Sequence, residues 1–229
     1  MFDHLKEISS ACFKEHLVGI YIHGSYVLDD FHWDHSDLDV IIVVDQEPEL
    51  KYKQQFLEEL VMMEDILPAG GIELSLLLLA DTQHFCHPMP YVFHYSNMHA
   101  CRARQDPQAY CSAMRGVDPD LACHLRLIRQ SGYVLFGRAI EEVFSEVPDS
   151  AYLDSVLQDL RVSDEQFLAD PAYYLANIGR TLYFLVSGRI VSKKEGRAYA
   201  AKIASGEEEL TLWHSLWQEM SKHLSGDML

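Results

Sequence analysis

Two aspartates, Asp37 and Asp39, stand at the start of an apolar stretch that continues to Val44. Side chains of a β-strand alternate between its two faces, so both carboxylates would project to the same side. Like charges at that spacing repel each other, and a divalent cation bound between them removes the repulsion. Because hard carboxylate oxygens suit Mg²⁺, the pair predicts a magnesium site at the start of this strand.

A Gly-Ser pair, Gly24 and Ser25, follows an earlier apolar run at residues 18–22. Glycine lets the backbone approach a ligand closely, and the N–H groups of a turn that enters a helix bind phosphate well. A Gly-Ser turn alone is common, and an isolated Asp-x-Asp is usually a solvated strand edge. In this order, between two apolar strands, the two features indicate phosphoryl or nucleotidyl transfer.

A third carboxylate, Glu73, lies near the start of an apolar stretch at residues 70–79. On a strand it would share a face with Ser75, while Ile72, Leu74 and Leu76 would face the other side. A charge in so apolar a strand is costly unless it has a partner or a function. We therefore expect Glu73 to join the two aspartates.

The elements that position these residues follow from hydrophobic periodicity. We expect helices at residues 2–16 and 49–67, with strands between them at 18–22 and 40–44 and a strand after them at 70–79. A strand at 92–96, a helix at 120–130, an edge strand at 133–136 and a short helix at 140–144 are also expected. Residues 81–107 are predicted to be loop-rich, because the histidines and the cysteine there match no closed zinc site.

The chain changes character at Pro148, after which only helical patterns occur. Capping boxes are expected at Ser163, Ser192 and Ser205, and Asp170 precedes a proline at the first helical position. The predicted fold class is α+β: an N-terminal domain at residues 1–148 with a mixed β-sheet and flanking helices, and a C-terminal α-helical bundle at residues 149–229.

The charge composition limits the kinds of molecule that the chain is expected to bind. The chain has 35 acidic and 18 basic residues and a formal net charge of −17, so we expect no nucleic-acid partner and a small cationic substrate instead. The 5 cysteines form no CxxC pair, which suggests free thiols in the cytoplasm. No signal peptide or membrane partner is expected, and the chain is expected to be a monomer.

The strand, Gly-Ser turn and Asp-Leu-Asp strand resemble the signature of the nucleotidyltransferase superfamily. Residues 177–200 resemble the C-terminal domain of aminoglycoside adenylyltransferases of the streptomycin/spectinomycin type, with Asn177, Arg180 and Lys193 in the matching pattern. Residues 118–148 resemble the segment that joins the two domains in that family. The resemblance covers most of the chain, and the helical part of it specifies the subgroup.

This resemblance implies ATP and Mg²⁺ bound between the domains and transfer of AMP to a hydroxyl of the drug. It implies metal ligands at Asp37 and Asp39, a catalytic base at Glu73, nucleotide-binding residues at Gly24, Ser25, Asn177, Arg180 and Lys193, and substrate-binding residues at Asp170 and His99. Two of these roles have structural alternatives. Asn177 and Arg180 could form an interdomain salt bridge, and N-capping alone explains Asp170.

At two positions the chain departs from the family pattern, and these positions bear on which drug accepts the AMP group. Family members that modify both drugs carry a tryptophan where this chain has Met98 or His99, and a second acidic residue where it has Gln166. The chain therefore resembles the spectinomycin-only branch more closely, with streptomycin disfavoured. Other interpretations are a nucleotidyltransferase that adenylylates a protein or another small molecule, and a nucleotide-binding sensor without turnover.

Overall fold

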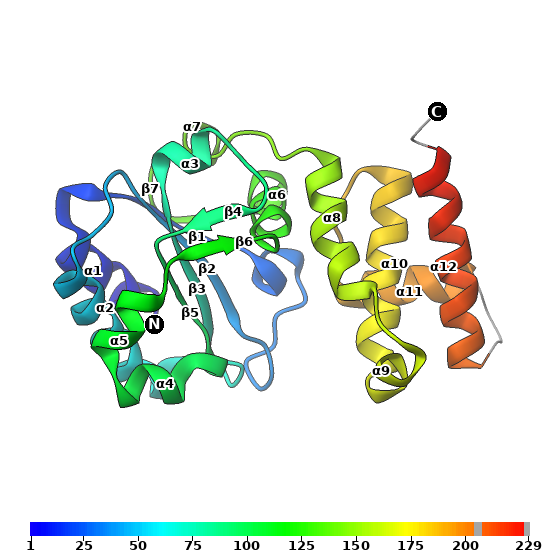
Figure 1. The fold of residues 1–229 in the computed structure, drawn as a ribbon, viewed down its shortest axis with the longest axis horizontal. Coiled ribbons are helices and arrows are strands. Elements are labelled where there is room, and N and C mark those ends of the chain that lie inside the picture. Colours follow the sequence, from blue (N-terminus) through cyan, green and yellow to red (C-terminus); the bar gives the residue numbers. More distant parts are fainter. Residues whose placement is uncertain (204–207, 227–229) are drawn as a thin grey trace. The chain divides into compact units, whose positions relative to one another are not determined.

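The chain forms two compact units, Met1–Ala151 and Tyr152–Leu229. The computed structural model describes residues 1–203 and 208–226 (Figure 1). The predicted cap at Ser205 lies outside the described residues. That residues 1–148 carry the nucleotidyl-transfer chemistry and residues 149–229 bind nucleotide and substrate stays a prediction.

A mixed five-stranded sheet forms the centre of the first unit. Its order is β5-β3-β2-β1-β7, with β2 and β3 parallel and the other neighbours antiparallel. The mixed sheet, and the edge position of the last strand, confirm the prediction. The strands are β1 (Leu17–Ile22), β2 (Leu38–Val44), β3 (Ile72–Leu78), β5 (Phe93–Tyr95) and β7 (Tyr133–Gly137), and a separate pair is formed by β4 (Met89–Tyr91) and β6 (Gly116–Asp118).

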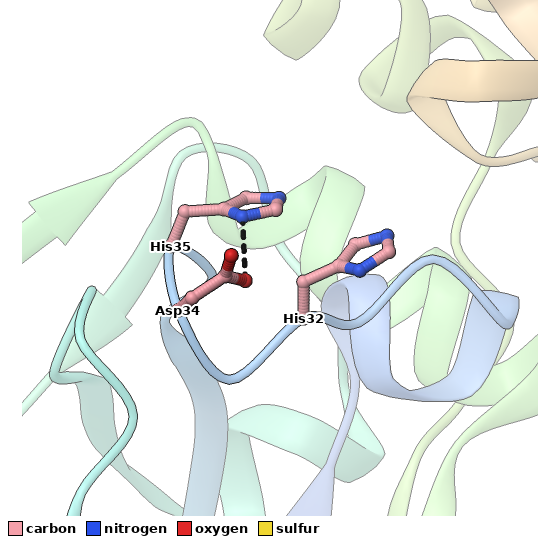
Figure 2. Close-up of side chains that lie close together, drawn as sticks. All are labelled: His32, Asp34 and His35. Carbon is pink, nitrogen blue, oxygen red and sulfur yellow. Dashed lines mark ion pairs between the residues drawn. The ribbon is translucent and has the colours of Figure 1, made fainter.

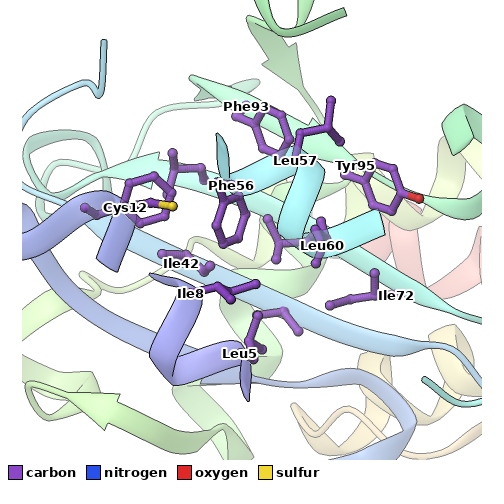
Figure 3. Packing of buried hydrophobic residues seen from close by; sticks show 14 of the residues in the cluster. Leu5, Ile8, Cys12, Ile42, Phe56, Leu57, Leu60, Ile72, Phe93 and Tyr95 are labelled. Atoms are coloured by element: carbon purple, nitrogen blue, oxygen red, sulfur yellow. The ribbon is translucent and has the colours of Figure 1, made fainter. Parts of the chain in front are cut away.

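Helices cover both faces of this sheet because its strands are apolar on both sides. On one face, Leu5 and Ile8 of α1 (Phe2–Phe13) and Phe56 of α2 (Leu50–Met62) pack on strand residues such as Ile42 and Ile72 (Figure 3). Also on this face lie α4 (Ala100–Gln105) and α5 (Pro107–Ala113). The opposite face is covered by α6 (Leu121–Ser131) and α7 (Ile140–Val143).

Two sequence predictions were wrong in detail. Residues 81–107 are not loop-rich, since they contain β4, β5, α4, the start of α5 and part of α3 (Leu79–Gln83). The strand β5 was expected at 92–96, whereas the other elements are too short for periodicity to reveal. Pairing with other strands stabilises β4 and β5. The helix expected at 49–67 ends at Met62, and a 3₁₀ turn, η3 (Glu64–Ile66), follows it.

The second unit is helical throughout its described part, as predicted. Its helices are α8 (Asp149–Leu160), which begins in the first unit, α9 (Asp164–Ala169), α10 (Pro171–Ser187), α11 (Lys193–Ile203) and α12 (Glu209–Gly226). Trp213 is buried at the centre of this unit and stacks on Phe167, with ring centroids 4.9 Å apart. The capping boxes at Ser163 and Ser192 are confirmed by hydrogen bonds in both directions. No described helix is long and apolar enough to span a membrane.

Two glycines let α10 and α11 approach each other closely. A Cβ atom on Gly179 would lie 2.0 Å from the Gly196 carbonyl oxygen, and one on Gly196 would lie 2.5 Å from the Ala176 carbonyl oxygen. Backbone atoms cannot rotate away as a side chain does, so any larger residue forces the helices apart.

Replacing Gly196 by Ala is therefore expected to lower the free energy of unfolding by about 1–3 kcal/mol, the usual cost of overpacking. Urea titration followed by circular dichroism measures the loss. Gly188→Ala is the matched control: its φ of 69° is strained for alanine, but nothing lies within 4 Å of the added Cβ. A loss at Gly196 no larger than that at Gly188 would contradict the crowding argument.

Candidate active site

Three carboxylates converge at one end of the parallel strand pair. Asp39 of β2 is directly opposite Glu73 of β3 in the register, and Asp37 immediately precedes β2. One carboxylate oxygen of each residue lies within 4.8 Å of the other two, and all three residues are half-buried. The neighbouring residues Leu38 and Leu74 point into the core on the other face. The alternation predicted from the sequence is therefore present, and the third carboxylate does join the pair.

The Gly-Ser turn lies directly against this carboxylate cluster. Gly24 opens a 3₁₀ turn, η2 (Gly24–Leu28), with a φ of 65°, and a Cβ atom there would lie 1.6 Å from Asp39 Oδ2. Only glycine fits, because both the conformation and the contact exclude a side chain. The hydroxyl oxygen of Ser25 is buried and has no hydrogen-bond partner among the described residues. An unpaired buried hydroxyl is costly unless a ligand completes it.

These residues fit a Mg²⁺ ion and a phosphate group. The donor set is all carboxylate oxygen, which is the chemistry of a hard cation. Three like charges within 4.8 Å of one another also repel until a cation binds. The unpaired hydroxyl of Ser25 provides a donor for a phosphate oxygen, and Gly24 lets the Asp39 carboxylate lie directly against the turn.

The second unit holds four of the other predicted site residues: Asp170, Asn177, Arg180 and Lys193. Asp170 caps α10, and its Oδ1 accepts a hydrogen bond of 3.1 Å from the backbone N–H of Tyr173. Lys193 is the first residue of α11, and its Nζ lies 5.1 Å from the centre of the Tyr173 ring. Asp170 and Lys193 therefore both contact Tyr173, the first at its backbone N–H and the second at its ring. Capping accounts for the position of Asp170, as the sequence allowed.

Asn177 and Arg180 form a small network inside the second unit. Arg180 donates from Nη1 to Asn177 Oδ1 at 3.2 Å and from Nε to the Val191 carbonyl at 2.8 Å. The two residues share a helix face, as their spacing predicts. These bonds link α10 to the segment before α11, which is a structural role in its own right; nucleotide binding by either residue stays a prediction.

Two family models match the chain. The nucleotidyltransferase domain matches residues 5–80, which contain the Gly-Ser turn and all three carboxylates. The C-terminal domain of aminoglycoside adenylyltransferases matches residues 142–219, which contain the predicted residues of the helical unit. The chain therefore combines a nucleotidyltransferase domain with the C-terminal domain of an aminoglycoside adenylyltransferase. It is an enzyme of the nucleotidyltransferase class.

A solved structure shares the fold of this chain. The spectinomycin adenyltransferase AAD(9) from Enterococcus faecialis, crystallised with ATP and spectinomycin, aligns with a TM-score of 0.73 and 18% identity over 94% of this chain and 87% of that one. A toxin–antitoxin structure with AMP-PNP aligns with a TM-score of only 0.33 and 12% identity, over 74% of this chain and 96% of that one. Comparison with curated protein sequences gives no significant match.

The hydrogen-bonded pair of Ser75 and His94, beside the carboxylates, was not assigned a role from the sequence. Ser75, two residues beyond Glu73, forms a 2.9 Å hydrogen bond with His94 Nδ1 across the β3–β5 pair. Burial lowers the pKa of His94, and the Glu73 charge opposes this effect. The His94 ring also contacts His99, at a centroid distance of 5.4 Å. Sequence alternation could suggest Ser75 but not its partner.

His99 therefore lies next to the carboxylate strand through His94, and its Nδ1 is 3.4 Å from the Tyr110 hydroxyl. Met98, the other residue considered at the tryptophan position, is 92% exposed. Gln166, which occupies the position of the second acidic residue, closes the capping box of α9 with Ser163. Contact of His99 with the acceptor stays a prediction.

His23, directly before the Gly-Ser turn, is fully buried and contacts the His124 ring at a centroid distance of 4.8 Å. Burial lowers the pKa of His23 well below its ordinary value of 6.5, and the nearby His124 acts in the same direction. As the pH falls below 6.5 the unfolded chain binds a proton at this position and the folded chain does not. The free energy of unfolding must therefore decrease as the pH falls.

One such histidine contributes a slope of about 1.4 kcal/mol per pH unit. His23→Gln removes that contribution, so its free energy of unfolding is expected to depend less steeply on pH between pH 6.5 and 5. Urea titrations at several pH values measure both slopes, and circular dichroism at neutral pH checks that the variant folds. Identical slopes for the two proteins would show that His23 does not titrate differently on folding.

Proposed function

We propose that this chain is an ATP- and Mg²⁺-dependent O-adenylyltransferase that transfers AMP to a hydroxyl of an aminocyclitol or aminoglycoside, with spectinomycin as the favoured acceptor. The observation that carries the proposal is the convergence of Asp37, Asp39 and Glu73 beside the Gly24–Ser25 turn. Metal-binding carboxylates next to a phosphate-binding turn are what nucleotidyl transfer requires.

Asp37 and Asp39 would hold Mg²⁺. The ion would neutralise the charge that develops on the phosphate oxygens. Gly24 and Ser25 position the phosphates through the backbone and the free hydroxyl. Glu73 accepts the proton of the acceptor hydroxyl. The acceptor oxygen forms a bond to the α-phosphorus, the bond from that phosphorus to the bridging oxygen breaks, and pyrophosphate leaves.

The nature of the acceptor is supported by charge and by two sequence positions. A formal net charge of −17 favours a cationic acceptor over an anionic one. The residues at the tryptophan and second acidic positions, His99 or Met98 and Gln166, favour spectinomycin over streptomycin. The solved AAD(9) structure contains ATP and spectinomycin, which supports the same pair of substrates here. Antibiotic resistance is the role we propose for this activity.

The remaining assignments are part of the same proposal. Asn177, Arg180 and Lys193 bind the nucleotide, and Asp170 and His99 contact the acceptor. The five cysteines are free thiols in the structure, which supports a cytoplasmic location, since thiols stay reduced there. We propose that the chain works as a monomer, with ATP and the small cationic acceptor as its partners, without nucleic acid or membrane.

A transfer assay read by mass spectrometry tests this function. The purified protein is incubated with ATP and Mg²⁺ and, in separate reactions, with spectinomycin or streptomycin. We expect an AMP adduct on spectinomycin alone, with one pyrophosphate released per adduct. Adducts on both drugs would keep the reaction and overturn the argument from His99 and Gln166. ATP binding without any adduct would overturn the proposed acceptor class.

A further inference from the structure

Two histidines and an aspartate gather on the segment between η2 and β2, away from the residues assigned above. His32, Asp34 and His35 are all exposed, and one ligand atom from each lies within 4.8 Å of the other two. Among the described residues, this is one of two sets with such spacing, and it is the one that contains nitrogen donors. None of these residues takes part in the proposed transfer reaction.

The side chains already face one another. Figure 2 shows the carboxylate of Asp34 beside the ring of His35, with the His32 ring next to them. Asp34 Oδ1 lies 2.9 Å from His35 Nδ1, and the two imidazole centroids are 4.7 Å apart with their planes only 20° from parallel. Two ligands of a tetrahedral Zn²⁺, each about 2.0 Å from the ion, lie about 3.3 Å apart. The Asp34–His35 spacing is close to that value.

Hydrogen bonds within the segment, and others to the residues before β3, hold its backbone in place. Within it, the His32 carbonyl accepts from the N–H groups of His35 at 3.2 Å and Ser36 at 2.8 Å, so that His32 and His35 share one side of a tight turn. The turn is also bonded to residues before β3: Ala69 N–H donates to the Trp33 carbonyl at 2.9 Å, and Gly70 N–H donates to the Ser36 carbonyl at 3.0 Å. A fixed backbone lowers the entropy cost of bringing three ligands to one ion.

We propose that His32, Asp34 and His35 bind one Zn²⁺ ion, with a fourth coordination position left to water. Two imidazoles and one carboxylate match the donors that zinc takes in three-ligand sites. The ligating imidazole nitrogens must be unprotonated for Zn²⁺ to bind. The side chains of Asp34 and His35 are 85% and 65% exposed, so each turns toward the ion without disturbing the core.

This site differs in chemistry from the carboxylate cluster of the proposed active site. Imidazole nitrogen selects borderline transition metals over Mg²⁺, whereas three carboxylates favour the hard cation. The two sites can therefore be occupied by different metals in the same molecule. The acidic surface of the chain, with its net charge of −17, raises the local concentration of any divalent cation.

Isothermal titration calorimetry with ZnCl₂ in excess Mg²⁺ and without ATP tests the site on the full chain. We expect one Zn²⁺ bound per chain, lost entirely in the double variant His32→Ala/His35→Ala. Asp34→Asn is expected to weaken binding by at least about 100-fold, because loss of an outer-shell partner alone costs about 10–100-fold and Asp34 is a direct ligand. A repeat in an Asp39→Asn background removes Zn²⁺ binding at the carboxylate cluster from the signal.

His16→Ala is the matched control, because His16 Nδ1 lies 2.8 Å from Asp45 Oδ1 in an exposed pair of the same type. No third ligand completes a cluster with that pair among the described residues. Its Zn²⁺ binding should equal that of the unmodified chain. No Zn²⁺ binding by the unmodified chain, or unchanged binding by the double variant, would overturn the proposal. The outcome is independent of adenylyl transfer, because binding is measured without substrates.

Discussion

Asp39→Asn is expected to reduce kcat/KM for AMP transfer by about a thousandfold. The substitution keeps the size of the side chain and removes the charge that would hold Mg²⁺ opposite Glu73. Metal stabilisation of developing charge on a phosphoryl group amounts to several kcal/mol, and each 1.36 kcal/mol corresponds to about a tenfold change in rate. Steady-state kinetics at saturating Mg²⁺ measure the loss, and raising Mg²⁺ further should recover part of it.

The matched control is Asp45→Asn, which removes a carboxylate immediately after the same strand. Asp45 pairs with His16 at the surface and belongs to neither three-residue ligand cluster of the described chain. Its kinetics should stay close to those of the unmodified enzyme. Asp39→Asn with full activity, or with a loss equal to that of the control, would show that Asp39 does not hold the metal.

Glu73→Gln is expected to lower kcat by about 10²–10⁴-fold, the usual contribution of a positioned general base. Glutamine keeps the shape of the side chain opposite Asp39 but cannot accept the proton of the acceptor hydroxyl. ATP affinity in the presence of Mg²⁺ should stay within about twofold, because Asp37 and Asp39 remain to hold the metal. Single-turnover kinetics and calorimetric ATP titrations measure the two quantities separately.

The structure also allows Glu73 to ligate the metal directly, since it lies in the same cluster as the two aspartates. The two roles give different results. If Glu73 is a metal ligand, ATP binding in Mg²⁺ falls together with kcat in the glutamine variant. Glu58→Gln, at an exposed position on α2, controls for the loss of one negative charge and should change neither quantity.

Much of both units could be predicted from the sequence, because the patterns that indicate their strands, turns and caps are local. The alternation of Asp37, Leu38 and Asp39 placed two carboxylates on one face of β2, and the structure has Leu38 in the core behind them. Gly24 and Ser25 marked the turn for the same reason, since a positive φ and a close backbone contact restrict the residue type. Caps at Ser163 and Asp170 fixed the starts of α9 and α10.

Which side chains face one another on neighbouring strands was decided by the tertiary structure. That Asp39 faces Glu73 depends on the parallel register of β2 and β3, and that Ser75 bonds His94 depends on a second strand pairing. Register is set by the packing of whole strands on the core, and no short pattern along the chain encodes it. Apart from the strand expected at 92–96, the short elements at residues 81–107 could not be predicted from the sequence for the same reason. Contacts with distant segments stabilise them, and their own periodicity does not.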